Sequence, residues 1–236
     1  MMNLFENRYI AHRGLHNSRL IPENSLLAFE KAVKKNYSIE LDITISKDNQ
    51  IVVFHDENLY RLCGFKENIE EMNYAFLKEL KLYETNEKIP LFKEVLNLVD
   101  GKITLVIEIK KHKNIGLLEN ILIDLLKNYK GKYLICSFEK DILFWFKKNK
   151  PNLKKGLIFE SNPKKFKKYN KTLFLYKYYK TKPDFISLDY KLLHSSIYDF
   201  CKKKALQISS WTIRDEENYE KIKTKVDAII FENITL

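Results

Sequence analysis

Short apolar runs alternate along the chain with segments whose apolar residues recur every three or four positions. The short runs are typical of buried strands, and the recurring pattern is typical of helices packed on a core. The first helix follows Asn24 or Ser25, either of which suits an N-cap, and it begins near Leu26. The other predicted helices span 74–82, 91–99, 115–128, 140–149, 164–180, 192–203 and 216–223. The predicted strands are Tyr9–Ala11, Ile103–Ile109, Lys132–Ser137, Gly156–Phe159, Phe185–Leu188, Gln207–Ile213 and Ala228–Phe231.

Residues 38–56 carry two further strand patterns. Two β-branched runs, Ser38–Ser46 and Gln50–Phe54, are separated by Lys47-Asp48-Asn49, which are typical turn residues. A parallel crossover needs a dozen or more residues. The short link therefore predicts a hairpin or a sharp bend.

The alternation of strands and helices predicts a mostly parallel α/β fold. If the hairpin counts as one barrel strand plus an arm, the chain has eight strands. A (β/α)8 barrel typically has about 250 residues, close to the 236 residues of this chain. We therefore predict one domain over residues 1–236, a (β/α)8 TIM barrel with a β-hairpin arm after strand 2 and a short insertion.

Three carboxylates lie in predicted strands. Glu40 and Asp42 are two residues apart and so point to the same face of their strand. Glu108 follows the continuous apolar run Leu105–Ile107, which indicates a buried strand rather than an exposed edge. Carboxylates in apolar surroundings are costly unless something compensates them. The three together suit a hard divalent cation, Mg²⁺ or Ca²⁺.

The candidate functional residues fall at or near predicted strand ends, which meet at one rim of a (β/α)8 barrel. Two imidazoles suit a general acid and a general base. Arg13 and Lys110 suit a negatively charged substrate. Together with a metal, these groups fit displacement at phosphorus. The residues near strand ends are His12, Glu40, Asp42, His55, Glu108, Lys110 and Trp211.

Motifs of several other enzyme classes are absent from the sequence. There is no Gly-rich phosphate loop, no Walker motif, no Gly-x-Ser-x-Gly and no Cys/His zinc spacing. The kinase, NTPase and serine-hydrolase interpretations therefore lose support.

The net charge of +11 rests on lysine, because only five of the 42 basic residues are arginine. Phosphate recognition favours arginine for its bidentate geometry. Residues 147–182 hold thirteen lysines and one acidic residue, Glu160. We interpret this stretch as a solvated surface, with membrane-surface contact and nucleic-acid binding as the alternatives. Within it, we predict that residues 164–180 form an outer helix whose inward side chains are Phe166, Tyr169 and Phe174.

The three cysteines, Cys63, Cys136 and Cys201, are widely spaced and suit free thiols in a reducing compartment. No apolar run approaches the roughly 18 residues of a membrane span. The first residues lack the basic and apolar regions of a secretory signal. We therefore expect a cytoplasmic protein.

An ordered set of motifs spans nearly the whole chain and resembles the glycerophosphodiester phosphodiesterase family. Each motif is weak alone, but the set occurs in the family's order. The motifs are His12-Arg13-Gly14, Pro22-Glu23-Asn24-Ser25, Glu40-Leu41-Asp42, Val52-Val53-Phe54-His55-Asp56, Leu59-Tyr60-Arg61, Ile89-Pro90-Leu91, Glu108-Ile109-Lys110, Trp211-Thr212 and Asp227-Ala228-Ile229-Ile230.

The resemblance implies a (β/α)8 fold, one divalent cation, and hydrolysis of glycerophosphodiesters to glycerol 3-phosphate and an alcohol. His12 and His55 match the family's catalytic histidines. The positions that match its metal ligands are Glu40, Asp42 and Glu108; those that match phosphate or substrate contacts are Arg13, Lys110 and Trp211. Arg214 and Glu232 depart from the family's usual Asn and Asp. The short segment between His55 and Ile89 leaves no room for a large capping domain.

Two alternatives stay open beside this interpretation. One is a lysophospholipase D-type phosphodiesterase, and the other is a non-catalytic barrel that binds phosphodiesters or lipids. The expected partner is a small glycerophosphodiester substrate, without nucleic acid and with at most weak membrane-surface contact. Several residues receive no catalytic role: we expect surface positions for His16, His112 and His194, a loop-orienting role for Glu23, either a partner or a turn role for Asp56, and a core or pocket position for Phe138.

Overall fold

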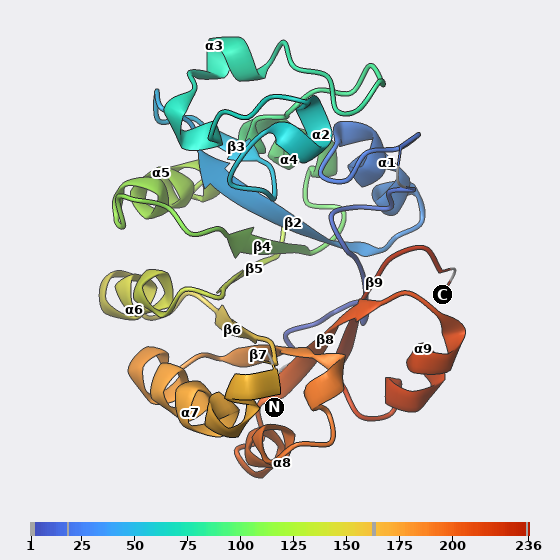
Figure 1. Ribbon diagram of the computed structural model, residues 1–236, viewed down its shortest axis with the longest axis vertical. Helices are drawn as coiled ribbons and strands as arrows, with labels where there is room; N and C mark the ends of the chain where they lie inside the picture. The colour runs from blue at the N-terminus through green and yellow to red at the C-terminus, as the bar shows by residue number, and fades with distance from the viewer. Residues whose placement is uncertain (1–2, 18, 162–163, 235) are drawn as a thin grey trace. The chain divides into compact units, whose positions relative to one another are not determined.

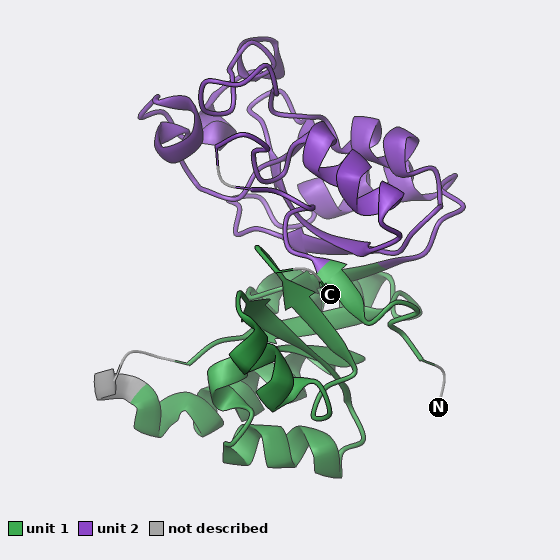
Figure 2. Cartoon of the chain, turned by 90° about the vertical axis from the view of Figure 1, so that its right-hand side faces the viewer, with its two compact units in different colours: residues 1–10, 134–236 green, residues 11–133 purple. Residues whose placement is uncertain are grey.

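The computed structural model describes residues 3–17, 19–161, 164–234 and 236, and it leaves out the side chains of residues 164–166. The chain divides into two compact units (Figure 2). Unit 2 comprises residues 11–133, and unit 1 comprises residues 1–10 and 134–236. The chain passes between the units within β1 (Tyr9–Ala11) and within β5 (Tyr133–Ser137).

The central strand of unit 2 is β2 (Ser38–Ile45), in which all eight residues are buried. It pairs in antiparallel fashion with β3 (Ile51–Val53), so the predicted hairpin is confirmed. On its other side it pairs in parallel with β4 (Leu105–Ile109), and this register sets Asp42 directly opposite Glu108. The pairing of β2 with β4 therefore brings two of the predicted metal ligands side by side.

Helix α1 (Leu26–Lys34) covers β2 and lies beside α4 (Phe92–Val99) (Figure 1). The hydroxyl of Ser25 accepts a hydrogen bond from the backbone N–H of Ala28 at 3.2 Å, which confirms Ser25 as the N-cap. Gly14 has a φ of +81°, and a Cβ there would lie 2.9 Å from atoms of Ala28. Glycine thus allows the turn after β1 to approach α1 closely.

The segment between the hairpin and α4 forms a small apolar cluster of its own. It contains two short helices, α2 (Tyr60–Cys63) and α3 (Tyr74–Leu77). The helix predicted over 74–82 is too long, because Lys81 instead forms a bridge with Lys88. The buried members of the cluster are Val52, Phe54, Leu59, Leu62, Ile69, Leu77, Leu80, Leu82 and Ile89.

Unit 1 contains a run of parallel strands, each followed or preceded by a helix. The hydrogen-bonded order is β6 (Lys155–Phe159), β7 (Phe185–Asp189), β8 (Gln207–Ile213) and β9 (Ala228–Phe231). The helices of this unit are α6 (Lys140–Asn149), α7 (Asn170–Thr181), α8 (Ser196–Lys203) and α9 (Glu216–Ile222). The predicted bounds of α6, β8 and β9 are confirmed, and the others differ by a few residues.

The lysine-rich stretch before β7 is only partly the outer helix that the sequence predicts. It begins as a 3-10 helix, η2 (Lys164–Tyr169), and continues as α7. Phe174 is fully buried, as predicted. Tyr169 is 52% exposed, so its predicted inward position is wrong, and the side chain of Phe166 lies outside the described residues.

No helix in the described part of the chain is long and apolar enough to cross a membrane. The three cysteines are free thiols, and Cys136 and Cys201 are buried. Both findings agree with what the sequence predicts.

His112 is not a surface residue, contrary to the prediction. Its side chain is 1% exposed, and its Nε2 lies 3.2 Å from Oε1 of the fully buried Glu119. Its Nδ1 bonds the backbone oxygen of Lys110 at 2.9 Å. Glu119 also accepts a hydrogen bond from the backbone N–H of Gly116, the N-cap of α5 (Leu117–Leu126). The pair therefore ties the end of β4 to the start of α5.

The charge of His112 should make stability depend on pH. Burial disfavours the imidazolium, but Glu119 outweighs it and raises the pKa of His112. A raised folded-state pKa contributes stability that is fully present below the ordinary value near 6.5 and is lost as pH rises through the folded value. We expect Glu119→Gln to lower the free energy of unfolding by about 1.5–3 kcal/mol at pH 6, and by less at pH 9. Urea denaturation at both pH values measures the difference.

The control for this experiment is Glu84→Gln, the same chemical change at an exposed position. It should leave stability unchanged at both pH values. An equal loss for Glu119→Gln at pH 6 and pH 9 would show that His112 does not carry the charge assigned to it.

Candidate active site

Three buried carboxylates form the centre of the site in unit 2. One oxygen each from Glu40, Asp42 and Glu108 lies within 4.8 Å of the other two. The β2–β4 register explains this proximity, because it sets Asp42 opposite Glu108 and places Glu40 two residues back on the same face of β2. Burial, together with the charges of Asp42 and Glu108, raises the pKa of Glu40 well above its ordinary value.

Two cations hold Asp42 in its ionised form. Lys110 Nζ lies 3.4 Å from Asp42 Oδ1 and 2.6 Å from Glu108 Oε1, and Arg13 Nε lies 3.3 Å from Asp42 Oδ2. Burial opposes ionisation of Asp42, but Lys110 and Arg13 outweigh it and lower its pKa. Burial and the charge of Asp42 raise the pKa of Glu108. The cluster therefore contains one firmly ionised carboxylate and two whose charge is disfavoured.

Two residues of the segment between β1 and α1 also fix the carboxylates, through hydrogen bonds that involve the backbone. Arg13 has a φ of 53° and donates its backbone N–H to Glu40 Oε2 at 3.0 Å. Asn24 has a φ of 57°; its Nδ2 donates to Asp42 Oδ2 at 2.9 Å, and its Oδ1 accepts the backbone N–H of Asp42 at 3.3 Å. Left-handed conformations in residues other than glycine are uncommon and gather at functional sites.

Arg61 joins two further carboxylates into one network. Its guanidinium donates to both oxygens of Glu23, at 2.7 and 2.8 Å, and to both oxygens of Asp56, at 2.7 and 3.0 Å. Glu23 also bonds Arg13 Nη1 at 2.6 Å. Asp56 Oδ1 lies 2.6 Å from His55 Nδ1. Because an ionised carboxylate only accepts, Nδ1 of His55 is the donor in this contact, and Nε2 takes no part in it.

The two histidines contact different carboxylates: His55 contacts Asp56, and His12 lies near Glu40. His12 Nε2 is 3.9 Å from Glu40 Oε2. His55 and Lys110 both line a cavity of about 210 Å³, together with Thr44 and residues 68–70 and 111–113. The cavity gives a ligand access to the imidazole and the ammonium from the same side.

Seven of the eight predicted site residues are thus in unit 2, where the structure connects them by short contacts or a shared cavity. They are His12, Arg13, Glu40, Asp42, His55, Glu108 and Lys110. The eighth, Trp211, is on β8 of unit 1. Its ring packs edge-on against the ring of Phe138, with 5.6 Å between the ring centroids.

The two departures from the family's usual residues also belong to unit 1, and they contact each other. Arg214 Nε forms an ion pair with Glu232 Oε1. The unusual cation and the longer acid therefore occur as a pair rather than as two independent changes.

Sequence reasoning underestimated four residues of the network. From the sequence, Glu23 and Asp56 have structural or uncertain roles, Asn24 is a candidate N-cap, and Arg61 has no role beyond its motif. The available signal was their position: each lies in a motif that carries the resemblance. Their partners are up to 38 residues away in sequence, as for Arg61 and Glu23, so local pattern does not reveal them.

Comparison with known proteins extends the resemblance. Residues 12–236 match the model of the glycerophosphoryl diester phosphodiesterase family. A glycerophosphodiester phosphodiesterase from Caldanaerobacter subterraneus is 32% identical over 235 residues, which cover 94% of this chain and 92% of the relative.

Solved structures agree with this assignment. The crystal structure of a glycerophosphodiester phosphodiesterase from Thermotoga maritima matches with a TM-score of 0.76 at 29% identity, covering 95% of this chain and 93% of the other. An Oleispira antarctica phosphodiesterase, solved with the product sn-glycerol-3-phosphate, matches with a TM-score of 0.83 at 21% identity, covering 95% and 92%. These matches confirm the (β/α)8 barrel with one extra strand. The chain belongs to the glycerophosphoryl diester phosphodiesterase family and is an enzyme with that activity.

Proposed function

We propose that this enzyme hydrolyses glycerophosphodiesters to glycerol 3-phosphate and an alcohol by a metal-dependent reaction with histidine acid/base catalysis. The observation that carries the proposal is the buried cluster of Glu40, Asp42 and Glu108, with their oxygens within 4.8 Å of one another. His55 and Lys110 line the adjoining cavity. The family model covers residues from both units, so we further propose that residues 1–236 act as one domain.

The charges around the cluster suit a divalent cation. Carboxylates outnumber the permanent cations five to three: the acids are Glu23, Glu40, Asp42, Asp56 and Glu108, and the cations are Arg13, Arg61 and Lys110. With all five carboxylates ionised, as metal binding would require, a divalent ion would balance that excess, and Mg²⁺ and Ca²⁺ both prefer oxygen ligands. Glu40, Asp42 and Glu108 would hold it, and when bound it would supply positive charge for a phosphate oxygen.

Arg13 and Lys110 are the proposed phosphate contacts. Both are largely buried, and each forms an ion pair with Asp42. Neutralisation of the carboxylates by a metal would release part of that positive charge for a phosphodiester anion. Cations placed where charge develops lower the barrier to displacement at phosphorus.

The histidines are the proposed proton carriers. One histidine removes the proton of the glycerol 2-hydroxyl, whose oxygen attacks phosphorus, and the other protonates the departing alkoxide of the alcohol. The product of this step is a cyclic phosphate. Water then opens the ring, with the two histidines exchanging roles, and glycerol 3-phosphate forms. Each acid/base contribution is typically about 10²–10⁴-fold, and the Asp56 contact keeps His55 in one tautomer.

A lysophospholipase D-type activity is the alternative. Lysophospholipase D from Rattus norvegicus is 34% identical to this chain over 143 residues, which cover 55% of this chain and 44% of that protein. An assay that compares two substrates separates the activities. It measures the release of glycerol 3-phosphate from soluble glycerophosphodiesters and the hydrolysis of lysophospholipids, each in the presence of Mg²⁺, Ca²⁺ or chelator. The cytoplasmic location stays a prediction, supported by the free thiols. The role of Trp211 as a substrate contact also stays a prediction.

Metal dependence is tested by Glu108→Gln, which keeps the size of the side chain and removes one negative ligand. We expect the affinity for Mg²⁺ or Ca²⁺, measured by isothermal titration, and the turnover to fall together, each by at least about tenfold, which corresponds to 1.4 kcal/mol. The circular dichroism spectrum should stay that of the folded protein.

Glu84→Gln is the matched control, because it makes the same change on the exposed surface. It should keep both metal affinity and turnover. Full activity of the parent enzyme after dialysis into excess chelator would refute the metal-dependent mechanism.

The nucleophile is tested with a substrate analogue that lacks the glycerol 2-hydroxyl. It should bind, as competition with the normal substrate would measure, but it should not be cleaved, because no internal oxygen can attack. His12→Ala and His55→Ala should each reduce turnover by at least about 10²-fold, whereas His194→Ala, at an exposed histidine, should not. Cleavage of the analogue at a comparable rate would mean that water or a histidine attacks phosphorus.

A further inference from the structure

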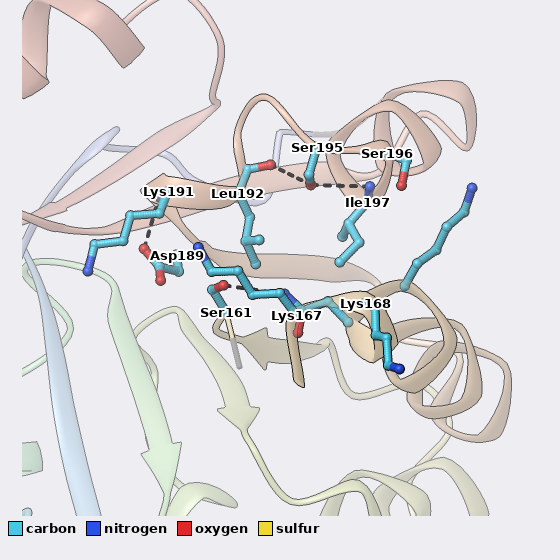
Figure 3. Close-up of a pocket in the computed structure, with 11 residues that line it drawn as sticks. Ser161, Lys167, Lys168, Asp189, Lys191, Leu192, Ser195, Ser196 and Ile197 are labelled. Atoms are coloured by element: carbon cyan, nitrogen blue, oxygen red, sulfur yellow. Dashed lines mark hydrogen bonds between the residues drawn. The ribbon is translucent and has the colours of Figure 1, made fainter. Parts of the chain in front are cut away.

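A second cavity lies in unit 1, between the segment that follows β6 and the segment that follows β7 (Figure 3). Its volume is about 650 Å³. These segments extend from the carboxyl ends of parallel strands, the ends at which (β/α)8 barrels bind ligands. The cavity is lined by Ser161, Lys167, Lys168, Asn170, Lys171, Asp189, Lys191, Leu192, Ser195, Ser196 and Ile197.

The lining carries an excess of positive charge. The lining residues include four lysines, Lys167, Lys168, Lys171 and Lys191, and a single acidic residue, Asp189. In the described part of the chain none of these four lysines forms an ion pair, and Asp189 already accepts the backbone N–H of Lys191 at 3.0 Å. Like charges gathered around one cavity repel one another, and a bound anion would relieve that repulsion.

Other lysines of unit 1 differ in this respect. Lys140 and Lys180 both pair with Asp141, and Lys154 and Lys155 both pair with Asp184. The unpaired charge at the cavity is therefore not simply the consequence of a lysine-rich composition.

The remaining polar groups of the cavity also favour an anion. Ser195 caps α8 by accepting the backbone N–H of Ile197 at 3.2 Å, and the amino end of this eight-residue helix lies at the cavity because Ser195, Ser196 and Ile197 all line it. A helix amino terminus attracts negative charge. Ser196, the first residue of α8, contributes a hydroxyl group to the lining.

The orientation of the side chains indicates where an anion would be held. Figure 3 shows Lys167 extending from η2 toward Asp189 and Lys191, whereas Lys168 points away from them. Lys167 and Lys191 come from different segments, so together they can contact one anion from two sides. Leu192 and Ile197 supply an apolar part of the lining, beside which the carbon atoms of an ester can pack.

We propose that this cavity is a second phosphate-binding site, which takes the phosphate group of an organic phosphate ester. A phosphate offers several acceptor oxygens and negative charge, which match ammonium, hydroxyl and helix-terminus donors. The volume exceeds that of a phosphate alone and leaves room for the attached organic group. Lysines are point-charge donors on flexible stems, so the site should accept esters of different shape. The proposal is independent of the metal and histidine roles proposed above.

The test uses the full-length protein and inorganic phosphate as the probe. We expect saturable shifts of the backbone amide signals of Ser196 and Ile197 in nuclear magnetic resonance spectra. Lys167→Ala combined with Lys191→Ala should weaken the affinity by about fivefold per lysine, if each contributes about as much as a lysine at an anionic surface. The control is Lys202→Ala combined with Lys203→Ala, which removes the same charge from exposed positions outside the cavity.

Two outcomes would overturn the proposal: amide signals at α8 that do not saturate with phosphate, or an equal loss of affinity in the two double variants. Unchanged signals from β8 and β9 in both variants would establish that unit 1 stays folded. A second measurement identifies the source of the phosphate. Co-sedimentation with phosphatidylglycerol vesicles that is weakened only by the cavity variant would assign a phospholipid headgroup. Equal co-sedimentation of both variants, with phosphate binding lost only in the cavity variant, would assign a soluble ester.

Discussion

The ionised carboxylate of Asp42, in a strand whose every residue is buried, is the constraint on which unit 2 depends. A buried charge without partners would cost several kcal/mol. The chain meets this requirement with Lys110 from the end of β4, Arg13 from the turn after β1, and the amide of Asn24 before α1. Each partner lies next to the end of a structural element, so these contacts tie β1, β4 and the start of α1 to β2. The left-handed conformations of Arg13 and Asn24 serve the same contacts.

The two lysine-containing sites differ in how their charge is balanced. In unit 2 every permanent cation of the cluster contacts a carboxylate, and the excess is negative. At the cavity of unit 1 the excess is positive, and the lysines are on the 3-10 helix η2, on α7 and on a second 3-10 helix, η3 (Tyr190–Leu192). A buried excess of negative charge attracts a small, strongly charged cation, whereas a hydrated lysine cluster attracts a larger anion. The two sites are therefore suited to ligands of opposite sign.

The sequence predicted the elements best where one pattern decides the structure. The β-branched and aromatic residues of β8, the apolar run of β9 and the amphipathic pattern of α6 allow few alternatives, and the bounds of these elements are confirmed. The helix predicted over residues 74–82 was too long, because the leucines of this segment suit a helix as well as the irregular apolar cluster that they form. The carboxylates could be predicted from their spacing in strands. The positions of His112 and Arg61 could not, because they depend on partners brought near by folding, Glu119 and Glu23.

The double contact of Arg61 has a consequence for how the site can be altered. Through Glu23 it reaches Arg13, and through Asp56 it reaches His55, so one guanidinium connects the proposed phosphate contact to a proposed proton carrier. Glu23 and Asp56 both accept hydrogen bonds from the guanidinium of Arg61, which has five N–H groups. A substitution at one of these carboxylates therefore changes how Arg61 bonds the other. Effects of changes within the network will therefore not add. An engineer who wishes to alter the environment of His55 must therefore treat Arg61, Asp56, Glu23 and Arg13 as one unit.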